Sequence, residues 1–255
     1  MDRKLTLEES KKIQVEMLSE FDRICRANNI TYFLAFGTLL GAVRHNGYIP
    51  WDDDIDVMVP RPEIAKLEDA FRNCPYKLAT IRNTKNYEFP FPRLLNTKTF
   101  HKYGNAKKHY GLFIDIYPID GVPSDENVRD KYKKDILRYA KPRLFLIRVR
   151  NYIWRHIPID IVPFIKYLTK KHANAYSICD YNTSNMVTVM QASLPPLDKK
   201  LFEKVTEVEF EGGKYFAPAE WDKVLTHWYG DYMQLPPEDK RHPYHGSDNM
   251  FIKED

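Results

Sequence analysis

The spacing of hydrophobic positions changes along the first third of the chain from the period of a helix to that of strands. Between residues 5 and 28, apolar side chains recur every three or four positions, which predicts an amphipathic helix. Thr6 followed three residues later by Glu9 is the pattern of a capping box at its start. Short strands are predicted next at residues 30–35 and 55–59, with a short helix between them at residues 38–44.

Further strands follow in the first half. The run LFIDIY has the strongest strand signal, because it is apolar except for Asp115 in its middle. A helix is predicted at residues 61–73, and strands are predicted at 76–81, 91–95 and 112–117. This alternation of short strands and helices indicates an α+β fold.

The pattern becomes mainly helical after Pro123. Helices are predicted at 125–140, 144–154, 159–181 and 220–229, with breaks at Pro142 and near Pro163. Short strands are predicted at 186–190 and 205–210, and a loop-like tail from residue 239. We therefore expect one compact unit, with residues 1–123 as an α/β core and residues 124–255 as a helical subdomain and tail.

Composition narrows the class of protein. The 255 residues are 43% apolar and 29% charged, with no apolar run long enough to span a bilayer and three widely spaced cysteines. The polar start is unlike a secretory signal, so a cytoplasmic location is expected. Residues 129–172 carry thirteen Lys or Arg against three Asp or Glu, or +10, so the net charge of +4 leaves −6 elsewhere. This acidic remainder argues against nucleic-acid binding.

Four aspartates fall within five residues, immediately before and within the strand predicted at 55–59. Because strand side chains alternate, Asp54 and Asp56 should share one face, with Asp52 on the same side if the strand extends back and Asp53 on the other. Adjacent carboxylates repel each other unless a cation lies between them, and Mg²⁺ prefers such oxygen ligands. Alone, this pattern also fits a solvated acidic turn.

Two further features favour a reaction site. Gly37 and Thr38 follow a predicted strand and open a helix, where backbone N–H groups and a hydroxyl can contact a phosphate. Asp115 is an acid in an apolar strand, which is costly to bury unless it is paired or binds a metal.

Three motifs carry a resemblance to a known family: GTLLGAVRHNGYIPWDDDID, GLFIDIYPIDGV and YGDYMQLPP. In order and spacing they resemble the LicD family of phosphocholine transferases, which belongs to the nucleotidyltransferase superfamily and is related to the fukutin-type transferases. The resemblance implies a nucleotidyltransferase-like core in residues 1–123. This core would be a small mixed β-sheet flanked by helices, with the two-acid strand beside the third acid. It also implies transfer of phosphocholine from CDP-choline to a glycan hydroxyl, with Mg²⁺, or Mn²⁺ in its place, and release of CMP.

Residue roles follow as hypotheses. The catalytic and metal-binding candidates are Asp54, Asp56 and Asp115, with Asp52 as a further ligand; Asp115 is alternatively the general base. The substrate-binding candidates are Gly37, Thr38, Arg44, Asp53 and Arg93. Arg44 would pair with a phosphate or with a neighbouring aspartate, and Arg93 with a phosphate or an acid. Asp53 is expected in the turn or behind the ligands.

Partners and alternatives stay open. The basic, apolar segment 141–171 fits peripheral contact with an anionic membrane, or a packed helix pair with a solvated face. The expected acceptor is a precursor of teichoic acid or lipopolysaccharide, which is either free or linked to a lipid. In the lipid-linked case, the protein would work at the inner face of the cell membrane. Alternatives are transfer of ribitol or glycerol phosphate, or a protein that binds a glycan or nucleotide without catalysis.

Overall fold

Two parallel strands, β3 (Ile55–Pro60) and β8 (Phe113–Val122), form the centre of the main sheet. The computed structural model describes residues 2–85, 87–103, 106–108, 111–156, 161–189, 194–242 and 249–253. The sheet runs in the order β10-β9-β8-β3-β2, with β2 (Phe33–Leu34), β9 (Met186–Val189) and β10 (Leu197–Asp198). All six residues of β3 are buried, which is typical of a central strand.

Strand β8 is long enough to hold two partners along its other edge. Its first residues pair with β5 (Arg93–Leu95) and its last residues with β9, both antiparallel. Strand β4 (Lys77–Ala79) pairs with β5 and completes a seven-stranded sheet. The predicted mixed sheet is therefore confirmed, although β2 is much shorter than the predicted strand at 30–35.

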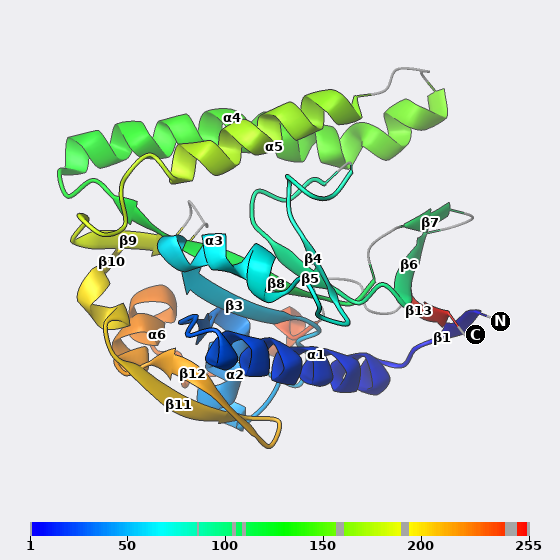
Figure 1. Cartoon of the computed structure of the whole chain (residues 1–255), viewed down its shortest axis with the longest axis horizontal. Helices are drawn as coiled ribbons and strands as arrows, with labels where there is room; N and C mark the ends of the chain where they lie inside the picture. Colours follow the sequence, from blue (N-terminus) through cyan, green and yellow to red (C-terminus); the bar gives the residue numbers. More distant parts are fainter. Residues whose placement is uncertain are drawn as a thin grey trace.

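Helices of the first half surround this sheet (Figure 1). They are α1 (Leu7–Ala27), α2 (Phe36–His45) and α3 (Arg61–Ala70). The predicted capping box of α1 is confirmed, because Thr6 Oγ1 accepts the Glu9 N–H and the Glu9 carboxylate accepts the Thr6 N–H. The buried face of α1, with Met17, Leu18 and Phe21, is part of the main core.

The second half opens with a helical hairpin along one side of the molecule (Figure 1). It consists of α4 (Glu126–His156) and α5 (Val162–Tyr176), which pack against each other. The predicted break at Pro142 is wrong, since α4 continues through it. Pro163 does not interrupt α5 either, because it lies in the first turn, where a missing N–H costs no hydrogen bond. Residues 159–160 and 190, which the predicted elements included, lie outside the described residues.

A mainly helical second half is not confirmed. After α5 the described residues include β9, β10, the hairpin of β11 (Val205–Phe210) and β12 (Gly213–Pro218), α6 (Trp221–Tyr229) and β13 (Met250–Lys253). Short 3₁₀ turns lie at Lys199–Phe202 and Glu238–Lys240.

The tail is not wholly loop-like. Strand β13 joins a second small sheet, in the order β1-β13-β6-β7, with β1 (Asp2–Lys4), β6 (Thr99–Tyr103) and β7 (Ala106–Lys108). The pairings of β13 with β1 and β6 join segments remote in sequence, so local patterns did not reveal them. Because β9 extends the same sheet as β8, the part after residue 123 continues the sheet of the first part. The division at residue 123 stays a prediction.

Candidate active site

Three of the four clustered aspartates lie just before β3. One carboxylate oxygen from each of Asp52, Asp53 and Asp54 lies within 4.8 Å of the others. Because the strand begins only at Ile55, side-chain alternation does not extend back through these residues. The expectation that Asp53 faces away is therefore wrong. This arrangement brings together oxygen ligands of the kind that a hard divalent cation prefers.

The fourth clustered aspartate, Asp56, lies beside the acid of the neighbouring strand, Asp115. Asp56 and Asp115 are partners in the parallel register of β3 and β8, so their side chains lie on the same face of the sheet. Their side-by-side placement, implied by the resemblance, is confirmed. Within the described residues, the buried Oδ1 of Asp56 has no hydrogen-bond partner.

The electrostatics of the cluster reflect this crowding. Burial, together with the negative charges of Asp54 and Asp115, raises the pKa of Asp56 well above its usual range. Burial and the neighbouring Asp54 raise the pKa of Asp52 to about 7. Bringing these carboxylates together is unfavourable without a cation, so the donor set fits a divalent metal.

Asp115 is instead paired with a buried cation. Arg93 is its register partner on β5, and Arg93 Nη2 donates to Asp115 Oδ2 at 2.8 Å. A second contact joins Arg93 Nε to Asp115 Oδ1. The guanidinium carbon lies 3.5 Å from the ring centre of Phe89 and 3.9 Å from that of Phe113. Of the two predictions for Arg93, the structure confirms the acid partner. Asp115 fits a direct metal ligand less well than the other acids do.

The start of α2 fits around the acidic segment. Phe36 has a left-handed backbone (φ 44°), and the helix begins there, so Gly37 and Thr38 lie in its first turn. A Cβ atom on Gly37 would lie 2.5 Å from Asp52 Oδ2, so a larger residue there would force the Asp52 carboxylate to move. Thr38 Oγ1 accepts the backbone N–H of Asp56 at 2.8 Å and thereby fixes the strand against the helix.

Arg44, at the other end of α2, is held by a later segment of the chain. Its Nη1 donates to the Tyr232 carbonyl at 2.7 Å, and its Nε donates to His45 Nε2 at 3.0 Å. No ion pair joins Arg44 to the acidic cluster within the described ranges, so the aspartate partner predicted as one alternative is wrong. The contact instead ties α2 to the YGDYM segment.

Aromatic residues complete the surroundings of the acids, and sequence reasoning missed one of them. Loss of hydration and the charges of Asp56, Asp52 and Asp54 raise the pKa of Tyr229, a residue that is 42% exposed. The sequence pattern predicts only that a helix ends at Tyr229. The structure confirms this end, because Gly230 follows with φ 68°. Its place at the start of the YGDYMQLPP motif was the available signal.

Ring contacts that are edge-to-face or tilted connect α6 with the central strand β8. The Phe36 ring lies 5.1 Å from Tyr117 and 5.0 Å from Trp228. Tyr117 donates its hydroxyl to Asp115 Oδ2 at 3.3 Å. Aromatic faces therefore border the acidic cluster.

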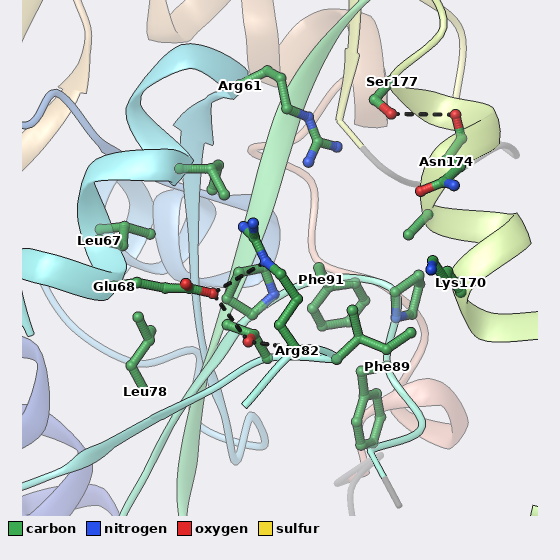
Figure 2. Close-up of a pocket in the computed structure, with 16 residues that line it drawn as sticks. Arg61, Leu67, Glu68, Leu78, Arg82, Phe89, Phe91, Lys170, Asn174 and Ser177 are labelled. Carbon is green, nitrogen blue, oxygen red and sulfur yellow. Dashed lines mark hydrogen bonds and ion pairs between the residues drawn. The ribbon is translucent and has the colours of Figure 1, made fainter. Parts of the chain in front are cut away.

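A separate pocket of about 270 Å³ lies between α3, α5 and the segment before β5. Figure 2 shows Arg61, Arg82 and Lys170 among its lining residues, together with the Phe89 and Phe91 rings. The clustered aspartates do not line it. Phe91 connects it to the site, since its ring lies 4.4 Å from that of Tyr117.

The sheet, with acids at the start of β3 and on β8, defines a mixed α/β protein. Its carboxylate cluster is suited to bind a cation and lies beside the N-terminus of α2. Residues 29–145, which contain all five of these acids, match the family model described as LicD/FKTN/FKRP, nucleotidyltransferase domain. This part of the chain therefore resembles the domain of that family.

Related proteins extend this likeness beyond the matched domain. The chain is 29% identical to the lipopolysaccharide cholinephosphotransferase LicD of Haemophilus influenzae, over 95% of this chain and 97% of that protein. It is also 32% identical to an uncharacterized protein of Rickettsia typhi, over 41% of this chain and 33% of that protein. Within the described ranges, no helix is both long and apolar enough to cross a membrane.

Proposed function

We propose that this phosphotransferase moves phosphocholine from CDP-choline to a hydroxyl group of a cell-surface glycan precursor and releases CMP, with Mg²⁺ as cofactor. The observation that carries the proposal is the likeness to a lipopolysaccharide cholinephosphotransferase along nearly the full length of both proteins. The acidic cluster supports it, because phosphoryl transfer needs a means of offsetting phosphate charge.

In this proposal Asp54 and Asp56, with Asp52, hold Mg²⁺, and Mn²⁺ can take its place. The bound metal would offset the charge of the donor diphosphate. The orphaned Oδ1 of Asp56 and the raised pKa of Asp52 support their assignment as ligands. Asp53 would hold the substrate from the same segment, and Gly37 and Thr38 would direct the first-turn N–H groups of α2 toward a phosphate.

Asp115 takes a different role from the other acids in this proposal. Because Asp115 is already paired with Arg93, we propose that it acts as the general base that removes the proton of the acceptor hydroxyl, and not as a metal ligand. Arg93 would keep this carboxylate in place, and the Tyr117 hydroxyl, which donates to the same Oδ2 atom, would help to orient it. Arg44 would contribute indirectly to substrate binding, because its hydrogen bond to the Tyr232 carbonyl positions the YGDYM segment.

The aromatic residues bordering the acids support choline as the headgroup. A quaternary ammonium binds to aromatic faces, and Tyr229 and Tyr117 are near enough to the carboxylates that burial and these negative charges raise the pKa of both phenols. Ribitol or glycerol phosphate is the alternative cargo. Lipopolysaccharide is the acceptor we favour because of the relative's name, and a teichoic acid precursor is the alternative. We place the reaction in the cytoplasm, at the inner face of the membrane.

The test is CMP release from CDP-choline with Mg²⁺ and lipopolysaccharide or teichoic acid acceptors, in parallel with CDP-ribitol and CDP-glycerol. Asp54→Asn and Asp56→Asn should each lower kcat by at least about 100-fold, or about 2.7 kcal/mol of transition-state stabilisation. The exposed Asp130→Asn on α4 is the matched control and should leave the rate unchanged. Near-normal transfer by Asp54→Asn or Asp56→Asn at saturating Mg²⁺ would refute the metal assignment.

A further inference from the structure

The outer face of the α4–α5 hairpin has exposed apolar side chains among basic ones. Along α4, Lys141, Phe145 and Arg148 recur at spacings of four and three residues, so they lie on one side of the helix. Phe145 is 63% exposed, and both neighbouring cations are exposed. A single exposed ring is common on a protein surface, but exposed apolar side chains that gather into one patch indicate a contact surface.

The second helix repeats this arrangement. Phe164, Tyr167 and Lys171 recur at spacings of three and four residues along α5, and the two rings are 54% and 52% exposed. These rings lie nearly parallel, with centroids 6.2 Å apart, and Lys171 Nζ lies 5.7 Å from the centre of the Tyr167 ring. We call these six residues of α4 and α5 the outer face.

The opposite faces of both helices are fixed to the body of the protein. Arg143 Nη1 donates to the Glu88 carbonyl at 2.5 Å, and Thr169 Oγ1 donates to the same carbonyl at 3.4 Å. Arg143 and Thr169 are buried, as is His172, one turn further along α5. The hairpin lies along one side of the molecule (Figure 1), and all six residues of the outer face are exposed, so this face is open to a partner.

The charge of the hairpin is of one sign near the outer face. Residues 136–179 contain nine Lys or Arg residues and a single acid, Asp160. Two copies of such a face would bring like charges together, which disfavours a self-complementary dimer. An anionic surface that also accepts apolar rings is the complementary partner.

We propose that the outer face docks onto a membrane surface rich in anionic phospholipid, with Phe145, Phe164 and Tyr167 in the headgroup region and the lysines and Arg148 beside the phosphates. The hairpin would lie flat on the bilayer without crossing it. This inference does not depend on the proposed transfer reaction, because it rests on residues outside the acidic cluster.

Flotation with vesicles tests the proposal. The full chain should float with phosphatidylcholine vesicles containing 30% phosphatidylglycerol in 0.1 M salt, and should be released at 0.5 M salt or from pure phosphatidylcholine. Lys141→Gln/Lys171→Gln should weaken binding about 25-fold, at roughly fivefold for each lost charge. Phe145→Ser/Phe164→Ser should weaken it at least about tenfold.

Matched controls carry the same changes on other surfaces. Lys12→Gln/Lys204→Gln removes two exposed charges elsewhere, and Ile178→Ser/Val205→Ser removes two exposed apolar side chains. Both should bind as the parent does, and circular dichroism checks that every variant is folded. No flotation at low salt, or an equal loss in the controls, overturns the proposal. So does a parent dimer in sedimentation velocity that Phe145→Ser/Phe164→Ser converts to monomer.

Discussion

Replacing Arg93 by Met tests how the buried ion pair holds the site together. The Arg93 and Asp115 side chains are only 9% and 3% exposed, so the substitution leaves a carboxylate buried without its cation. Breaking such a pair from one side costs about 3–5 kcal/mol. The guanidinium itself lies against the Phe89 and Phe113 rings. Met is apolar and unbranched, so it is chosen to fill part of this space while removing the charge.

The measurement is urea unfolding followed by circular dichroism at neutral pH in EDTA, so that no divalent cation contributes. We expect Arg93→Met to lower the free energy of unfolding by about 4 kcal/mol. Arg93→Met/Asp115→Leu should recover at least about 2 kcal/mol of it, because the unpaired buried charge is gone. Arg72→Met is the matched control: its ion pair with Asp69 is exposed, so the loss should stay below about 1 kcal/mol.

Two results would refute this reasoning. A loss below about 1 kcal/mol for Arg93→Met would mean that Asp115 is solvated or satisfied by other groups. A double variant as unstable as the sum of the two single variants would mean that the two charges are not coupled.

Three further predictions concern other contacts. Asp56→Asn should raise the melting temperature in EDTA by about 2–6 °C, since it removes a repelled buried carboxylate, and should reduce the further rise on adding Mg²⁺. Thr38→Val should lower the free energy of unfolding by about 1–3 kcal/mol, because the buried Asp56 N–H loses its acceptor. Burial and the Arg143 charge lower the pKa of His172 to about 4, so the unfolded chain binds an extra proton between about pH 6.5 and 4. Urea midpoints should therefore fall as pH decreases through that window, and less so in His172→Gln.

Local sequence patterns predicted the features that depend on neighbours along the chain. The Thr6 capping box involves residues three apart, and the structure has both of its hydrogen bonds. The strand containing Asp56 was also predicted nearly to its ends, because a run of apolar residues is closed by Pro60. The facing of Asp56 and Asp115 came instead from the family resemblance, because two segments far apart in sequence meet there.

The errors arose where packing between distant segments decides the outcome. Pro142 breaks an isolated helix, but α4 packs along α5 and continues past it. The geometry of Asp53 depended on a strand boundary, the least reliable part of a sequence-based prediction. Tyr229 reaches the acids from more than 170 residues further along the chain, so nothing local marked it as part of the site.

The charges around the site bear on how a diphosphate would bind there. Arg93 is buried against Asp115, and Arg44 is held by the Tyr232 carbonyl, so neither guanidinium is free to meet a phosphate without breaking a contact. The first turn of α2 offers N–H groups, but Asp52 Oδ2 lies close enough to exclude a Cβ from Gly37. We infer that the carboxylates repel an anionic donor until a cation is bound. Equilibrium binding of CDP-choline should therefore be weak in EDTA and should strengthen at least about tenfold with Mg²⁺, whereas equal binding in both conditions would mean that the chain's own residues hold the phosphates.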